Sequence, residues 1–194
     1  LLKNDGLLPL DVDKLSSIAV IGPNADSQEV LKGNYNGTAS EYVTILEGIH
    51  RICDGRARVF YSEGCPLYRD RSEGLALPGD RLGEAVAVAR EADVVVLCLG
   101  LDPRIEGEEG DASNEYGAGD KAHLNLPGLQ QKLLEKVVAV GKPTILVLSS
   151  GSALAVNFAQ DHCSAIVQNW YAGSYGGQAV AELLFGKFSP SGRL

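Results

Sequence analysis

The fold of this 194-residue chain is decided by one apolar stretch, Asp93-Val94-Val95-Val96-Leu97-Cys98-Leu99-Gly100. Its apolar residues are continuous rather than alternating with polar ones, which is typical of a strand buried on both faces of a sheet. Four other short stretches rich in apolar and β-branched residues also predict strands. They occupy residues 17–22, 58–61, 143–149 and 164–171.

Amphipathic stretches lie between these predicted strands. Apolar residues at positions i, i+3, i+4 and i+7 form one face of a helix, and this spacing is clear in 82–89 and 129–138. Residues 177–186 also carry apolar residues at helical spacing, and weaker helical patterns occupy 28–31 and 45–52. Helices are therefore expected to connect most of the strands.

The alternation of strands and helices predicts an α/β domain with a mainly parallel central sheet and helices on both faces. We therefore expect a three-layer α/β/α sandwich of the flavodoxin-like type, spanning residues 1–194 as a single domain. The chain contains no methionine, so Leu1 is not an encoded start, and we expect this domain to belong to a longer polypeptide.

The composition is that of an ordinary globular protein, with 45% hydrophobic and 22% charged residues. There are 17 basic and 25 acidic residues, which gives a formal net charge of -8. This balance argues against a nucleic-acid partner, because phosphate binding requires a basic face. No apolar stretch reaches the ~18 residues that a membrane span requires, so no membrane partner is expected.

The four cysteines are Cys53, Cys65, Cys98 and Cys163. No two of them are spaced as a CxxC pair, so free thiols are expected, although a Cys53–Cys65 disulfide is geometrically possible. The three histidines are widely separated and show no metal-ligand spacing, which favours surface or cap positions. We predict neither a metal nor a cofactor.

The segment after the central strand holds the strongest candidate for chemistry. Six carboxylates lie from Glu106 to Asp120, with no basic residue among them. The next helix is expected only near Pro127, so the loop runs for about 25 residues, well beyond the usual strand-to-helix connection. In parallel sheets, functional groups collect at the carboxyl ends of the strands. This loop is therefore the predicted functional region.

The acidic loop allows three interpretations. It could be a solvated surface loop, since runs of charge usually are. It could carry a general acid, because crowded carboxylates raise one another's pKa and a glycosidase acid must keep its proton near neutral pH. It could also bind Ca²⁺, but its spacing does not match the EF-hand loop.

Other motifs have simpler explanations. Ser149-Ser150-Gly151-Ser152 follows a predicted strand but lacks the Gly-x-Ser-x-Gly order, so a turn or a helix N-cap is expected. Residues 22–26 lack the dinucleotide-binding and P-loop patterns. Trp170 and Tyr171 end a predicted strand and could line a sugar site, although aromatic residues more often belong to a core or an interface.

Several stretches, in order along nearly the whole chain, are similar to one enzyme family. They are Leu1-Leu2-Lys3-Asn4-Asp5-Gly6-Leu7-Leu8-Pro9-Leu10, Ile18-Ala19-Val20-Ile21-Gly22-Pro23-Asn24-Ala25, Gly33-Asn34-Tyr35-Asn36-Gly37, Gly107-Glu108-Glu109-Gly110-Asp111, Leu124-Asn125-Leu126-Pro127-Gly128-Leu129-Gln130 and Pro190-Ser191-Gly192-Arg193-Leu194. In these stretches the chain resembles the C-terminal α/β sandwich domain of family 3 glycoside hydrolases of the β-glucosidase and β-xylosidase type.

This resemblance implies a retaining mechanism with two carboxylates. An aspartate nucleophile would come from a preceding (β/α)-barrel domain that is not in this chain, and the loop of this domain would contribute a glutamate acid/base. The two groups lie about 5–5.5 Å apart in retaining enzymes. The implied substrate is a β-linked oligosaccharide or an aryl glycoside, and the isolated chain is expected to be inactive.

The resemblance also suggests individual residues. Glu109 precedes a glycine, as the acid/base does in one form of the family's loop, and Glu106 is the alternative. Asp111, Asp120 and Lys121 are expected to belong to the substrate loop, with Lys121 standing where the family usually has an arginine. A non-catalytic flavodoxin-like binding or interaction module remains the competing function, because fold does not imply function.

Overall fold

The computed structural model describes residues 1–69, 77, 79–107 and 121–194. These residues contain a six-stranded sheet in the order β1-β6-β5-β4-β2-β3. All neighbouring strands run parallel except β1, which pairs antiparallel with β6. The strands are β1 (Lys3–Asn4), β2 (Ser17–Ile21), β3 (Arg58–Ser62), β4 (Val94–Gly100), β5 (Thr144–Ser149) and β6 (Ala165–Gln168).

The five parallel strands confirm the predicted fold class. Taken in chain order from β2 to β6, they lie in the spatial order 2-1-3-4-5, which is the flavodoxin-like arrangement. In such a sheet, ligands bind outside the carboxyl ends of the strands, near the point where the strand order reverses. Here that point lies between β2 and β4.

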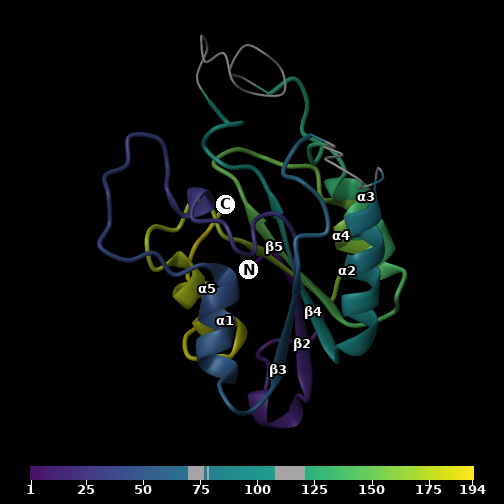
Figure 1. Cartoon of the computed structure of the whole chain (residues 1–194). Helices are drawn as coiled ribbons and strands as arrows, with labels where there is room; N and C mark the ends of the chain where they lie inside the picture. Colours follow the sequence, from purple (N-terminus) through teal and green to yellow (C-terminus); the bar gives the residue numbers. More distant parts are fainter. Residues whose placement is uncertain (70–76, 78, 108–120) are drawn as a thin grey trace.

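Helices cover both faces of the sheet (Figure 1). One face carries α1 and α5, and the opposite face carries α2, α3 and α4. Two short 3₁₀ helices, η1 (Val12–Lys14) and η2 (Glu29–Leu31), lie in the connections. The α-helices are α1 (Ile45–Cys53), α2 (Asp80–Glu91), α3 (Gln130–Val138), α4 (Asn157–His162) and α5 (Gly176–Leu184).

The side chains of β4 explain why its apolar run is continuous. Val96 and Cys98 pack against the α1/α5 face, whereas Val95 and Leu97 pack against the α2/α3/α4 face. All four are fully buried. Because alternate residues of a strand point to opposite faces, a strand between two helical layers needs apolar residues at every position.

Two glycines allow the strand ends to approach closely at the carboxyl edge. Gly22 follows β2 with a φ of 120°, and Gly100 ends β4 with a φ of 129°, a backbone conformation that favours glycine. A Cβ atom at Gly22 would lie 2.1 Å from the Cys98 carbonyl oxygen, and one at Gly100 would lie 2.1 Å from the Ser149 carbonyl oxygen. Any side chain here would push neighbouring strands apart and move the loops that follow them.

Two local predictions need correction, and one α-helix was not predicted. The strand predicted for 164–171 ends at Gln168, since Trp170 adopts a left-handed φ of 57° that no strand continues through. The weak helix expected over 28–31 is a 3₁₀ turn, η2. Helix α4 was not predicted, because its six residues carry no apolar stripe.

All four cysteines are buried and none forms a disulfide, so the prediction of unbridged thiols is confirmed and the Cys53–Cys65 disulfide, left as a possibility, is not formed. Burial raises the pKa of the Cys53 and Cys163 thiols to about 11. Their reactivity is correspondingly low, because the thiolate is the nucleophilic form. No helix in the described part of the chain is both long enough and apolar enough to cross a membrane.

Candidate functional site

The predicted site residues fall into two groups. Glu109, Asp111 and Asp120 lie outside the described residues. Glu106 and Lys121 are described. They precede and follow residues 108–120 in the sequence, and they lie at the carboxyl edge of the sheet. The geometry of the site is therefore the geometry of these two residues and of the loops that hold them.

A tight turn after β4 sets the position of Glu106. The carbonyl oxygen of Asp102 accepts hydrogen bonds from the backbone N–H groups of Ile105 and Glu106, both at 3.1 Å. The Asp102 side chain also accepts one from the Arg104 N–H at 2.9 Å, as turn-forming aspartates often do. Asp102 and Ile105 are each 1% exposed, so the turn is fixed by both hydrogen bonds and burial.

The Glu106 carboxylate accepts three hydrogen bonds from two other strand-end loops. Oε2 accepts from the Gly151 N–H at 2.7 Å and from the Tyr171 hydroxyl, and Oε1 accepts from the Ser152 hydroxyl. Gly151 and Ser152 follow β5, while Tyr171 follows β6. We call Glu106, Gly151, Ser152 and Tyr171 the carboxylate clamp. It joins the loops after three adjacent strands.

The tyrosine of the clamp is held in its neutral form. Burial, followed by the hydrogen bond to Glu106 and the negative charge of that carboxylate, raises the pKa of Tyr171 far above its ordinary value. The hydroxyl therefore acts as a lasting donor to Glu106 over the whole physiological pH range.

Lys121 contacts the loop after β5, which is also the loop that Glu106 binds. Its Nζ donates to the Ala153 carbonyl oxygen, one residue beyond the clamp residue Ser152. Burial lowers the pKa of Lys121, and the negative charge of Glu106 acts in the opposite direction. The two described ends of the acidic segment are thus bound to one short stretch, residues 151–153.

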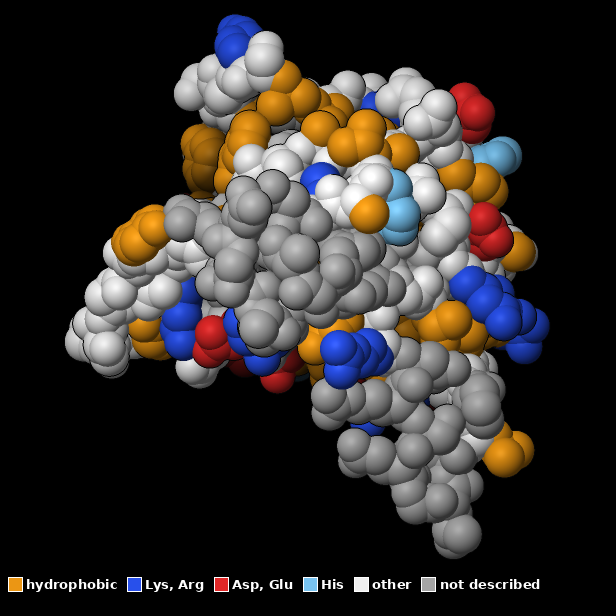
Figure 2. Space-filling view, turned by 90° about the horizontal axis from the view of Figure 1, so that it is seen from above, with side chains coloured by type: hydrophobic (Ala, Val, Ile, Leu, Met, Phe, Trp, Pro, Cys, Tyr) orange, Lys and Arg blue, Asp and Glu red, His pale blue; other side chains and the backbone are white. Residues whose placement is uncertain are grey.

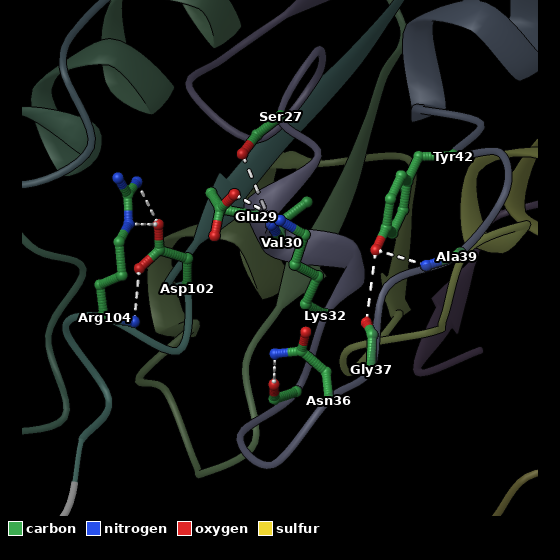
Figure 3. A network of polar contacts seen from close by, with 11 residues as sticks. Ser27, Glu29, Val30, Lys32, Asn36, Gly37, Ala39, Tyr42, Asp102 and Arg104 are labelled. Carbon is green, nitrogen blue, oxygen red and sulfur yellow. Dashed lines mark hydrogen bonds and ion pairs between the residues drawn. The ribbon is translucent and has the colours of Figure 1, made fainter.

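A second polar network lies beside the turn after β4 (Figure 3). The Arg104 Nε and Nη2 atoms donate to Asp102 Oδ2 at 2.8 and 2.5 Å. This hydrogen bonding raises the pKa of Arg104, and the charges of Asp102 and of Glu29 add to the effect. Glu29 is itself paired with Lys32 at 2.7 Å. The segment after β2 and the turn after β4 therefore share one charge network.

The carboxyl edge of the sheet is seen from above in Figure 2. Among the described side chains in this view, basic groups (blue) are scattered rather than gathered in one patch, and some lie directly beside acidic groups (red). A nucleic-acid-binding face would instead carry its basic residues in one stripe or patch.

A cavity of about 650 Å³ opens between the segments that precede α3 and α4. It is lined in part by the amides of Asn125, Gln131 and Asn157 and by the ring of Phe158. None of its lining residues is an aspartate, glutamate, lysine or arginine. Neutral hydrogen-bonding groups with an aromatic ring suit an uncharged polar ligand better than an ionic one.

The described residues offer no evident metal centre. Over 1–69, 77, 79–107 and 121–194, no group of three or more His, Cys, Asp or Glu side chains is placed to hold a metal ion. His50, His123 and His162 are exposed, as their spacing predicted.

Sequence reasoning gave Ser152 only a place in a turn or a helix N-cap, and it gave Tyr171 only a possible place along a sugar site, without a link to Glu106. The stretch 149–152 is a turn, as expected, in which the Ser150 hydroxyl donates to the Ser152 carbonyl at 2.8 Å. It is not a helix N-cap, because α4 begins only at Asn157. One signal was available: both residues follow parallel strands, and the carboxyl ends of such strands meet at a single edge.

Comparison with known proteins identifies the class of molecule. The model of the Glycosyl hydrolase family 3 C-terminal domain matches residues 1–194, and the chain therefore belongs to this family. This result confirms the resemblance found in the sequence motifs.

Curated relatives with similar sequences are named as β-glycosidases. The chain is 36% identical over 201 residues to a "Beta-xylosidase" from Formosa agariphila, and 40% identical over 199 residues to "Beta-D-xylosidase 1" from Arabidopsis thaliana. It is 34% identical over 209 residues to a "Periplasmic beta-glucosidase" from Salmonella typhimurium. Each match covers the whole of this chain but only 26%, 23% and 26% of the respective relative. The chain thus spans about a quarter of their length.

Solved structures give the same result. The GH3 exo-beta-xylosidase XlnD, solved with a xylobiose aziridine activity-based probe, matches with a TM-score of 0.83 and 30% identity, over 99% of this chain and 23% of that one. The β-glucosidase EmGH1 from Erythrobacter marinus matches with a TM-score of 0.80 and 31% identity, over 96% of this chain and 26% of that one.

Proposed function

We propose that this chain is the domain of a retaining β-glycosidase that supplies the acid/base glutamate and part of the substrate site. The observation that carries the proposal is the position of the two described residues that border the acidic segment. Glu106 and Lys121 are both bound to the 151–153 stretch at the carboxyl ends of the parallel strands. Ligand-binding groups of such sheets lie at this edge.

The reaction divides between two domains. In a retaining mechanism one carboxylate attacks the anomeric carbon, and the other protonates the departing glycosidic oxygen and then takes a proton from water. We assign the nucleophile to an aspartate of a preceding (β/α)-barrel domain, in the part of the polypeptide that this chain does not include. The length of the relatives, about four times that of the chain, leaves room for such a domain.

Glu109 is the proposed acid/base. Glu106, the alternative, has both carboxylate oxygens engaged in hydrogen bonds within the chain, an arrangement that suits an anchor better than a group that hands a proton to a substrate. Asp111, Asp120 and Lys121 are proposed to bind substrate hydroxyls. No cofactor is proposed, because this chemistry requires only two carboxylates and water.

The proposed substrate is a β-linked oligosaccharide or an aryl glycoside. The names of the relatives, which include both β-xylosidases and β-glucosidases, support this class. The cavity beside α3 and α4, lined in part by amides, His123 and the ring of Phe158, agrees with it, since sugars are bound by amides and aromatic rings.

Replacement of the acid/base tests the proposal. In the full-length polypeptide, Glu109→Gln is expected to lower kcat on an unactivated β-glycoside by about 10²–10⁴-fold, the usual contribution of general acid–base catalysis. The loss should be much smaller for a dinitrophenyl glycoside, because that leaving group needs no proton. Steady-state kinetics on both substrates measures the difference.

The neighbouring glutamates are the matched controls. Glu108→Gln and Glu115→Gln change the same functional group in the same acidic segment and are expected to keep the wild-type dependence on leaving group. If Glu109→Gln retains the wild-type rate on the unactivated substrate, the role belongs to whichever glutamate variant shows the selective loss.

The flavodoxin-like strand order would also suit a non-catalytic ligand-binding module. Such a module would bind a nucleotide or flavin at the reversal point between β2 and β4. Titration with FMN, ATP and xylobiose, followed by calorimetry, separates the two functions. Tight binding of FMN or ATP would favour the module.

A further inference from the structure

We propose that Glu106 is a positioning residue, not the acid/base: through the carboxylate clamp it holds the start of the acidic segment against the loops after β5 and β6. The inference deepens the proposed glycosidase function and rests on it. It begins from the three hydrogen bonds that Gly151, Ser152 and Tyr171 donate to this one carboxylate.

The clamp is built from both sides. On the Glu106 side, the Asp102 turn and the buried Ile105 leave the backbone little freedom. On the other side, the donors are a backbone N–H at Gly151 and the hydroxyl of the partly buried Tyr171, which the raised pKa keeps protonated. A carboxylate that accepts several hydrogen bonds, one of them from a fixed backbone N–H, is held in one place.

The clamp leaves no spare room at its centre. A Cβ atom at Gly151 would lie 3.3 Å from Glu106 Oε2 and 3.4 Å from Tyr171 Cε2. Glycine at this position therefore allows the carboxylate and the aromatic ring to meet the backbone at hydrogen-bonding distance.

The clamp also fixes where the acidic segment begins relative to where it ends. Glu106 binds residues 151 and 152, and Lys121 binds the carbonyl of residue 153. The two described residues that border the acidic segment are thereby held at one place on the edge of the sheet. Position matters greatly for proton transfer, since a displacement of about 1 Å can lower the rate by about 10²-fold.

The test separates positioning from acid catalysis by changing, in separate variants, the carboxylate of the clamp and one of its hydrogen-bond donors. In the full-length polypeptide, Tyr171→Phe removes one donor and keeps the ring. We expect kcat on an unactivated glycoside to fall by about 10- to 100-fold for Tyr171→Phe and for Glu106→Gln, because the anchored loop loosens. The double variant should be no slower than the slower single variant, since both changes break one contact.

Tyr175→Phe is the matched control. Tyr175 donates to Glu41 at 2.5 Å, which is the same chemical contact, but both residues are exposed. Its kcat is expected to stay within about 2-fold of wild type, as for other exposed pairs. Ser152→Ala is a second clamp variant, with a smaller expected loss, in case either larger change prevents folding.

Azide provides the decisive readout. When an acid/base carboxylate is removed, azide can enter the vacated space and attack the anomeric carbon, displacing the enzyme carboxylate to give a glycosyl azide. A positioning residue leaves no such space beside that carbon, so azide should not restore turnover to Glu106→Ala. Formation of glycosyl azide by Glu106→Ala would overturn the proposal and make Glu106 the acid/base itself.

The remaining outcomes are also informative. Wild-type kinetics in both Tyr171→Phe and Ser152→Ala would show that the clamp positions nothing of importance, while the proposed function would stand. Absence of glycosidase activity in the wild-type polypeptide would instead refute the proposed function, and the positioning role would fall with it.

Discussion

Two tyrosine–glutamate hydrogen bonds in this chain share their chemistry but not their surroundings. Tyr171 donates to Glu106 in the carboxylate clamp, where the tyrosine is partly buried. Tyr175 donates to Glu41 at 2.5 Å, and its side chain is 49% exposed. Glu41 also accepts from Arg51 at 2.8 Å, so this second group is a surface charge network.

The pKa of each tyrosine is raised, but the main cause differs between the two. Burial is the main cause that raises the pKa of Tyr171, whereas the hydrogen bond to Glu41 is the main cause for Tyr175. Water competes for the exposed pair and salt screens it, but neither reaches the clamp as freely. The same two side chains therefore form an anchor in one place and a weak surface contact in the other.

Removal of each glutamate should give the largest contrast. Glu106→Ala is expected to lower the free energy of unfolding by about 2–3 kcal/mol, because Gly151 and Tyr171 lose the acceptor of their hydrogen bonds. Glu41→Ala should change it much less, since water replaces the lost contact. Denaturant unfolding followed by circular dichroism measures both. Equal effects would mean that the clamp has no advantage over a surface pair.

Alkaline titration should give a smaller contrast. The ordinary pKa of tyrosine is 10.0, and that of Tyr171 is raised in the folded state. Below pH 10 both states keep the proton and the clamp's contribution is complete. Above it only the unfolded state releases the proton, so stability falls as pH rises. The buried Cys53 and Cys163, raised from 9.0 to about 11, act in the same direction from about pH 9.

Absorbance of the tyrosinate band at 295 nm checks this titration. Tyr171→Phe should leave the native titration curve up to pH 11 unchanged, because this tyrosine does not ionise in the folded protein. Tyr175→Phe should remove part of the amplitude. An equal loss of amplitude in both variants would contradict the role assigned to burial.

Salt should produce the smallest effect. The coupling between Arg51 and Glu41 in the exposed network, measured by a double-mutant cycle, is expected to fall between 0.05 and 1 M NaCl, because exposed charges are screened. The coupling between Tyr171 and Glu106 should change little over the same range. A similar loss in both pairs would indicate that water enters the clamp freely.

The sequence predicted the layers well because burial leaves a clear periodic signal. The strand β4 was recognised from its continuous apolar run, and α2, α3 and α5 from their apolar faces. Helix α4 has only six residues with one buried alanine, so no periodicity could reveal it. The end of β6 was predicted too far along the chain, because the residue types of 165–171 do not indicate the left-handed conformation at Trp170.

The site was predicted only in part, for a physical reason. The acidic composition of the loop is local information and is visible in the sequence. The partners of Glu106 are 45, 46 and 65 residues away along the chain and meet it only through the sheet topology. A serine in a turn and a tyrosine after a strand look ordinary until the fold brings them to one carboxylate.

The anchoring of Glu106 and Lys121 to neighbouring residues of one turn has an evolutionary consequence. Glu106 and Lys121 are bound to neighbouring residues, so the segment between them forms a closed loop. The entropic cost of closing such a loop grows only slowly with its length, by about 0.6 kcal/mol for each doubling. Insertions and deletions between the two anchors should therefore be inherited without harm to the sheet. Loop length can then change in evolution while the same α/β core is kept.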